Sequence, residues 1–255
     1  MRYFIEFSYN GSDYHGWQRQ NNAISVQQVL EESLTLIQGE NINVIGAGRT
    51  DTGVHAKFMV AHFDVKELSE IENDFIYKLN QLLPKSIVMM NIRQVKDDAH
   101  ARFDAVSRTY LYYISQVKDP FNNSLHYFYK EKLDWDIMNQ ASKIITNYKD
   151  FECFSKSNTD VKTFLCDIEK AFWEINDNGA VFKITANRFL RNMVRAIVGT
   201  LIEIGNGKKK IKDLEKILKS KERSKAGYSV PAKGLFLTEI KYPNQIFLKN
   251  VKNSR

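Results

Sequence analysis

The segment Gly46–Ala56, which reads Gly-Ala-Gly-Arg-Thr-Asp-Thr-Gly-Val-His-Ala, constrains this chain more than any other stretch. Its three glycines surround an arginine, an aspartate and two threonines, and glycine allows both unusual backbone angles and the close approach of a ligand. Apolar residues on each side predict strands at about 41–47 and 56–65. The sequence therefore predicts a dense polar cluster on a short loop between two strands.

Two interpretations of this loop remain open. The Asp51 carboxylate could bond to its own backbone in an ordinary tight turn, or it could act on a ligand. The glycine spacing does not match Gly-x-Gly-x-x-Gly, and no Gly-Lys-Ser/Thr follows. Neither a dinucleotide-binding fold nor a P-loop is therefore supported.

Composition narrows the class of protein. The 255 residues carry a formal net charge of +7 and a pI near 9.2, which makes a polyanion, nucleic acid first, a fair partner. Cys153 and Cys166 cannot form a disulfide framework and indicate a reducing compartment, so the expected location is the cytoplasm. The alternating N-terminus does not resemble a signal peptide, and no apolar run approaches the ~20 residues of a membrane helix.

The first part of the chain predicts a ferredoxin-like unit. Its expected elements are a strand at 2–9, a helix from about 26 to 37, strands at 41–47 and 56–65, a helix from about 70 to 83, and a strand at 87–95. Ser25 with Gln28, and Ser69 with Glu72, have the spacing of a capping box and should open the two helices. The order β-α-β-β-α-β is that of the split βαβ unit.

A second unit of similar plan follows. Its expected elements are a strand at 107–116, a helix from Asp134, a hairpin of strands at about 163–176 and 180–186, helices at 188–204 and 211–220, a strand at 235–242, and a basic tail at 249–255. We therefore predict an α+β protein of two halves, 1–97 and 98–255. Each half should have a mostly antiparallel sheet with helices on one face, and a cleft between the halves is the expected site.

The expected helix at 188–204 is apolar over most of its surface, yet Arg188, Arg191 and Arg195 fall on one stripe. Apolar residues flank Arg195 on both sides, and a guanidinium in such surroundings needs a carboxylate or a phosphate. An ordinary ion pair of the core is the alternative, and Arg188 and Arg191 could simply be solvated. An anion-binding role and a structural role both remain possible.

Two other groups of side chains admit functional and structural interpretations. Tyr110, in the strand that also carries Tyr112 and Tyr113, could pack within the sheet or stack on a nucleic-acid base beside a cleft. His55 and His62 suggest a metal only weakly, because their spacing fits neither a zinc finger nor a zincin. We therefore expect no metal.

Six segments resemble the tRNA pseudouridine synthases of the A type. In order they are Tyr9–Gln20, Gly48–Ala56, Leu79-Asn80 with Leu83-Pro84, His100–Ala105 with Arg108-Thr-Tyr110, Asn192–Arg195 with Val198-Gly199, and Gly234–Leu237. This resemblance implies a pseudouridine synthase fold of two ferredoxin-like halves, in homodimers without cofactor or metal. The implied activity is the isomerisation of uridine to pseudouridine at positions 38–40 of the tRNA anticodon stem-loop.

The resemblance also implies roles for individual residues. Asp51 corresponds to the family's nucleophile, Arg49 to its neighbouring arginine, Arg195 to the basic partner of the nucleophile, and Tyr110 to the tyrosine that stacks on the base. The expected substrate contacts further include Arg108, Arg102, Gln18, Arg188 and Arg191. The chain departs from the family at Cys166, where an arginine is usual, which questions one contact in the second half.

The required chemistry suits these residues independently of the resemblance. Moving ribose from N1 to C5 of uracil needs no redox partner, and one carboxylate can act by covalent catalysis on C6 of the base or on the ribose carbon. A single loop aspartate also differs from the paired carboxylates of glycoside hydrolases. The competing classes are a non-catalytic RNA-binding module, whose sheet-face signature is missing, and a metal-dependent nuclease.

Overall fold

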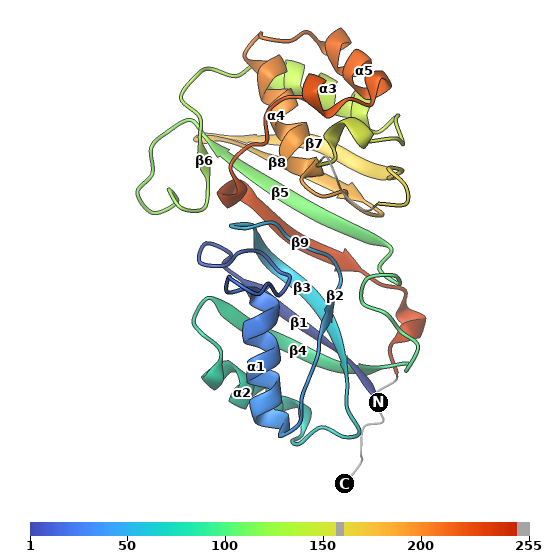
Figure 1. Ribbon diagram of the computed structural model, residues 1–255. Helices are drawn as coiled ribbons and strands as arrows, with labels where there is room; N and C mark the ends of the chain where they lie inside the picture. Colours follow the sequence, from blue (N-terminus) through green and yellow to red (C-terminus); the bar gives the residue numbers. More distant parts are fainter. Residues whose placement is uncertain (157–160, 249–255) are drawn as a thin grey trace.

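The computed structural model describes residues 1–156 and 161–248, so the basic tail expected at 249–255 lies outside the described residues. Within these residues, nine strands form a single sheet of mixed α+β architecture (Figure 1). The strands are β1 (Arg2–Tyr9), β2 (Ile45–Gly46), β3 (His55–Asp64), β4 (Ile87–Val95), β5 (Ser107–Ser115), β6 (Tyr127–Phe128), β7 (Ile168–Asn176), β8 (Gly179–Ala186) and β9 (Leu235–Lys241). The α-helices are α1 (Val26–Gln38), α2 (Glu72–Leu82), α3 (Trp135–Ile145), α4 (Met193–Gly205) and α5 (Ile211–Ser220).

The strand order is β4-β1-β3-β9-β5-β8-β7, with β2 added on β3 and β6 on β5. Only β3–β9 and β5–β6 pair in parallel, so the sheet is mostly antiparallel, as expected. One sheet in each half was expected, whereas the described residues form a single sheet. The C-terminal strand β9 joins the two halves, because it pairs with β3 on one side and with β5 on the other.

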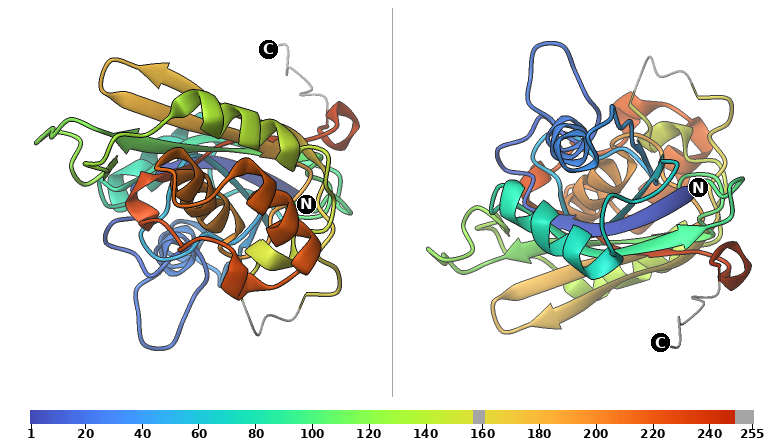
Figure 2. Two further views of the ribbon diagram at one scale, coloured as in Figure 1. Left: turned by 90° about the horizontal axis from the view of Figure 1, so that it is seen from above. Right: turned by 90° about the horizontal axis from the view of Figure 1, so that it is seen from below.

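Each end of the sheet has its own hydrophobic core. The helices α1 and α2 contact each other at the N-terminal strands, whereas α3 packs on β7 and on α4. The end-on views of Figure 2 show α1 lying against the strands of the N-terminal half. Tyr110 packs against both cores, and Val54, just after the Asp51 loop, belongs to the C-terminal one. The Asp51 loop therefore lies at the junction of the two hydrophobic cores.

Four expected element boundaries were wrong. The strand expected from about residue 163 begins only at Ile168, as β7. The α2 helix begins after Ile71 without a side-chain cap, so the capping box at Ser69 is not formed. The strand expected at 41–47 is reduced to the short β2. Helix α4 begins only at Met193, because the preceding Asn192 has φ +67° and interrupts the helical path. Arg188 and Arg191 therefore precede the helix and do not share a helical stripe with Arg195.

The first capping prediction was half right. The side chain of Ser25 accepts a hydrogen bond from the backbone N–H of Gln28 at 3.3 Å. Gln28 does not complete the box, because its amide donates to Glu32 at 3.0 Å instead. One side-chain cap is enough to open α1, which buries Val26, Leu30 and Leu34 against the sheet.

Candidate active site

The loop that carries Asp51 is held through its main chain. The N–H of Trp17 donates to the Thr50 carbonyl at 3.2 Å, and the N–H of Gly53 donates to the Tyr14 carbonyl at 3.3 Å. The Thr50 hydroxyl also bonds the Tyr9 hydroxyl at 2.8 Å. The segment that follows β1 thus supports the Asp51 loop.

Glycine is required where these two segments meet. Gly16 has φ +88°, and a Cβ at this position would lie 2.5 Å from the Thr50 carbonyl oxygen. Gly53, on the loop itself, has φ +75°. Both angles are strained for residues with a side chain, so the loop needs glycine at these places to turn its carboxylate towards the C-terminal half.

Two arginines of the C-terminal half meet the Asp51 carboxylate. Arg195 Nη1 lies 3.6 Å from Oδ2, and Arg191 Nε lies 3.4 Å from Oδ1. The side chains of Asp51 and Arg195 are 23% and 21% exposed, so the pair is largely shielded yet reachable from solvent, whereas Arg191 is 59% exposed. The pairing expected between Arg195 and Asp51 is therefore present, and sequence reasoning missed that Arg191 contacts the same carboxylate.

The chain before and at the start of α4 explains why both arginines reach one carboxylate. Asn192 adopts a left-handed conformation, and its side-chain amide donates to the Ser229 hydroxyl at 2.6 Å. Arg195 lies just inside the helix, and its Nε donates to the Val230 carbonyl at 2.7 Å. The left-handed residue turns the chain between Arg191 and Arg195, and the segment 229–230 fixes both sides of the turn.

Tyr110 lies close enough to Asp51 for the charge of that carboxylate to affect its phenol. Burial raises the pKa of its phenol to about 12, the Arg108 charge opposes that rise, and the Asp51 charge adds to it. Its ring meets Phe189 edge-on, with the centroids 5.1 Å apart. An aromatic ring held in this way can contact a flat substrate beside the carboxylate.

The side chain of Arg108 forms its hydrogen bonds with backbone carbonyls. Its guanidinium donates to the carbonyls of Ala47, Arg102, Ala105 and Asn187 at 2.6–3.1 Å. Four carbonyl acceptors satisfy nearly all of its donors. Arg108 therefore connects the strand end before the Asp51 loop to the segments around 102–105 and 187, and its expected substrate contact stays a prediction.

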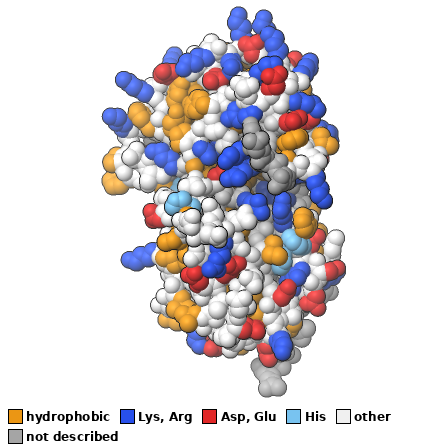
Figure 3. Space-filling model, viewed as in Figure 1, with side chains coloured by type: hydrophobic (Ala, Val, Ile, Leu, Met, Phe, Trp, Pro, Cys, Tyr) orange, Lys and Arg blue, Asp and Glu red, His pale blue; other side chains and the backbone are white. Residues whose placement is uncertain are grey.

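Three of the four remaining predicted residues are exposed. Arg49 and Arg102 are exposed, and within residues 1–156 and 161–248 Arg49 makes no side-chain hydrogen bond or ion pair. Gln18 is exposed and follows Trp17, which contacts the loop. Arg188 is half-buried near Cys166. Figure 3 shows Lys and Arg side chains gathered on one face at the level where the two halves meet.

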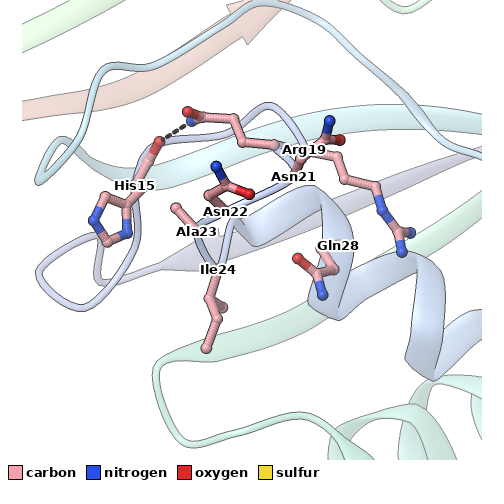
Figure 4. Close-up of a pocket in the computed structure, with 8 residues that line it drawn as sticks. His15, Arg19, Asn21, Asn22, Ala23, Ile24 and Gln28 are labelled. Carbon is pink, nitrogen blue, oxygen red and sulfur yellow. Dashed lines mark hydrogen bonds between the residues drawn. The ribbon is translucent and has the colours of Figure 1, made fainter.

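A shallow polar hollow lies nearby on the segment that supports the loop (Figure 4). It is lined by His15, Arg19, Gln20, Asn21, Asn22, Ala23, Ile24 and Gln28. The Gln20 amide donates to the His15 carbonyl at 2.8 Å and closes one side of it. None of the residues that meet at Asp51 lines the hollow, so we assign the chemistry to the Asp51 cluster.

The side chains considered for other chemistry have structural roles. His55 Nδ1 accepts from the N–H of Gly11 at 3.0 Å, its Nε2 bonds the Lys233 carbonyl at 3.2 Å, and burial lowers its pKa. Burial raises the pKa of the free thiols of Cys153 and Cys166 to about 12 and about 11. In the described part of the chain, no group of three or more His, Cys, Asp or Glu could hold a metal ion. Over the same residues, no helix is long and apolar enough to cross a membrane.

Comparison with known proteins identifies the family of the chain. A family model described as tRNA pseudouridine synthase matches residues 6–104 and 148–243. The chain is 49% identical to tRNA pseudouridine synthase A of Bacteroides thetaiotaomicron, over 100% of this chain and 95% of that protein. It is 50% identical to the Bacteroides fragilis enzyme of the same name (97% and 98% covered) and 40% identical to that of Acetivibrio thermocellus (92% and 96%). The chain therefore belongs to the tRNA pseudouridine synthase family, a family of isomerases, and within it to the A type.

Proposed function

We propose that this chain converts uridine to pseudouridine at positions 38–40 of the tRNA anticodon stem-loop, with Asp51 as the nucleophile. The observation that carries this proposal is the meeting of one carboxylate with two guanidiniums from the other half of the chain, at 3.4 and 3.6 Å. The two guanidiniums hold this carboxylate at the junction of the two halves. An ionised carboxylate is the form that attacks an electrophilic carbon.

The reaction needs only groups that the chain supplies. The bond between ribose C1′ and N1 of uracil breaks, the base turns, and a bond forms between C1′ and C5. The hydrogen at C5 leaves as a proton, while N1 gains one, so the product is an isomer of the substrate. Asp51 would hold one fragment covalently during the rearrangement, by attack on C6 of the base or on the ribose carbon.

The surrounding side chains fit the handling of one unstacked nucleotide. Extruding a base costs a few kcal/mol, and stacking on the Tyr110 ring would offset part of this cost. Among the described residues the exposed Arg49 guanidinium, on the loop itself, has no hydrogen-bond or ion-pair partner, so we assign it to the substrate next to the scissile bond. We assign Arg102, Arg188 and Gln18 to contacts with the RNA backbone. Arg191 and Arg195 would hold Asp51 and the reacting nucleotide together.

The finer architecture belongs to the same proposal. Residues 1–97 and 98–255 would form two ferredoxin-like halves, with the substrate cleft at their junction and β9 as the strand they share. Two copies would form a homodimer that holds one tRNA across both subunits. We place this enzyme in the cytoplasm, where its tRNA substrate is processed and its buried free thiols stay reduced.

The test is release of tritium from tRNA labelled at C5 of uridine. We expect label to appear in water without added metal, nucleotide or reductant, and in the presence of a chelator. Transcripts that retain uridine at only one of positions 38, 39 and 40 would each release label, and a transcript with none of them would not. Tight binding without any release would instead identify a non-catalytic RNA-binding module, and loss of activity in chelator would indicate a metal-dependent enzyme.

A further inference from the structure

Phe103 lies in the segment between β4 and β5 and is 74% exposed. Exposure alone carries little weight, because scattered exposed apolar side chains are normal, and Phe121 is 89% exposed as well. What distinguishes Phe103 is the backbone that carries it. The turn at residues 100–105 is fixed by hydrogen bonds on every side.

The turn is closed by its own polar groups. The N–H groups of Arg102 and Phe103 both point at Nδ1 of His100, at 3.1 and 3.3 Å. The His100 N–H donates to Asp104 Oδ2 at 2.7 Å, and the Asp104 N–H returns to the His100 carbonyl at 3.0 Å. These four bonds fix the backbone that carries Phe103.

Residues of other segments also form hydrogen bonds with this turn. Nδ1 of the buried His62 accepts from the Ala101 N–H at 3.1 Å, and the Tyr242 hydroxyl donates to the Ala101 carbonyl at 2.5 Å. Arg108 donates to the Arg102 carbonyl at 2.6 Å and to the Ala47 carbonyl at 3.1 Å. Ala47 lies four residues before Asp51, so one guanidinium connects the Phe103 turn directly to the catalytic loop.

The groups around the ring favour a ligand that has both an aromatic part and a negative charge. One face of Phe103 packs on His100, with the centroids 4.2 Å apart, and the Arg102 guanidinium lies 5.7 Å from the ring centroid. Arg102 and Arg49 are both exposed. A nucleotide offers a flat base for the ring and a phosphate for the arginine. A second copy of this chain would bring the same cations and a net charge of +7.

We propose that Phe103 is a stacking platform for an unpaired base of the tRNA anticodon arm that neighbours the target uridine. Arg102 contacts the phosphate of that nucleotide. This inference rests on the proposed function, because it assigns a second nucleotide subsite to the same active site. The rigid turn removes the ordering cost that a flexible aromatic side chain would carry on binding.

The experiment measures binding of an anticodon stem-loop RNA to Phe103 variants, together with KM and kcat for tritium release. Phe103→Ala should raise Kd and KM about tenfold, a typical loss for one base–aromatic stack. Phe103→Tyr should bind like the unaltered chain, whereas Phe103→Leu should be weak because it keeps apolar surface but no ring. Phe121→Ala is the matched control, since it removes an equally exposed ring beyond the other end of β5, and its Kd should stay within about twofold.

A second measurement reads stacking directly and does not depend on Phe103→Ala being folded. The tryptophan of Phe103→Trp should lose fluorescence when the stem-loop binds, beyond any change of the three native tryptophans. Unchanged Kd and KM in both Phe103→Ala and Phe103→Leu, or an unquenched Phe103→Trp, would overturn the platform. A change in the oligomeric state of Phe103→Ala without a change in stem-loop affinity would assign the ring to a chain–chain interface. Absence of tritium release by the unaltered protein would instead overturn the proposed function, and the binding and fluorescence results would still decide on the platform.

Discussion

The two sides of the active site are built by different means. On the N-terminal side, the Asp51 loop is held by main-chain hydrogen bonds to the segment around Tyr14 and Trp17. On the C-terminal side, Arg191 and Arg195 are placed by one left-handed residue, Asn192, before a helix. The first arrangement needs space and glycine, and the second needs one unusual backbone angle and long side chains. Different substitutions should therefore damage each side.

The largest effect short of removing the carboxylate itself is expected at Arg195. Arg195→Met would leave Asp51 with only the more exposed Arg191 as a partner, and the rate of tritium release should fall roughly 100-fold. Arg195→Lys keeps the charge but loses the planar fork, so it should retain part of the rate. Single-turnover assays at saturating tRNA would measure both. Equal rates for Arg195→Met and the unaltered chain would show that Arg195 serves only to stabilise the fold.

Gly16→Ala tests the N-terminal side. The added Cβ would lie 2.5 Å from the Thr50 carbonyl, at a residue with φ +88°. We expect a loss of about 2–3 kcal/mol in the free energy of unfolding and a clear fall in kcat, because the loop must shift. Denaturant unfolding and tritium release would be measured on the same preparation. Gly39→Ala is a useful control, since Gly39 also has a positive φ but a Cβ there meets nothing within 4 Å; an equal effect on kcat would remove the special role of the loop contact.

A smaller effect is expected on the C-terminal side at Asn192. Asn192→Ala keeps a Cβ in the left-handed conformation and loses the bond to Ser229, which should cost about 1 kcal/mol and lower kcat several-fold. Asn192→Gly loses the same bond but accepts φ +67° without strain. Glycine should therefore retain more activity than alanine. The reverse order would mean that the Ser229 bond, and not the backbone angle, positions the arginines.

The smallest effect at neutral pH is expected from His62, which supports the Phe103 turn. Burial, followed by the Arg2 charge, lowers its pKa from 6.5 to about 4, so the folded state holds it neutral while the unfolded state binds a proton below pH 6.5. Its contribution is thus complete above pH 6.5 and declines by up to about 3 kcal/mol as the pH falls towards 4. His62→Asn should flatten this part of the stability profile, as measured by urea unfolding between pH 7 and 4. An unchanged slope would assign the acid sensitivity to other groups.

The parts of this site that depend on local pattern could be predicted from sequence. The Asp51 loop stood out by its glycines and charges between apolar strands, and Arg195 by its apolar neighbours, which required an anion. The role of Arg191 was missed because Asn192 interrupts the helix through a backbone angle, which the spacing of apolar residues does not report. Asn192 just before the helix was the available signal, since asparagine tolerates that angle better than most residues.

Long-range arrangement could not be read from the same patterns. The position of β9 between β3 and β5 depends on pairing between residues far apart in the chain, and periodicity within β9 carries no information about its neighbours. The four carbonyls around Arg108 come from three separate segments. Because every residue has a backbone carbonyl, no sequence pattern indicates these bonds. The antiparallel α+β character followed from element order, while the single continuous sheet followed only from the tertiary structure.

If the Asp51 carboxylate performs the chemistry, Asp51→Asn should abolish the reaction and leave binding intact. The change is nearly isosteric, so the fold should persist, and affinity for tRNA should stay within about tenfold because phosphate contacts dominate it. The measurement is single-turnover tritium release from C5-labelled tRNA, with enzyme in excess and bound tRNA quantified in the same sample. We predict full binding and no release by Asp51→Asn, against stoichiometric release by the unaltered chain. Substantial release by bound Asp51→Asn would contradict it and move the nucleophile elsewhere.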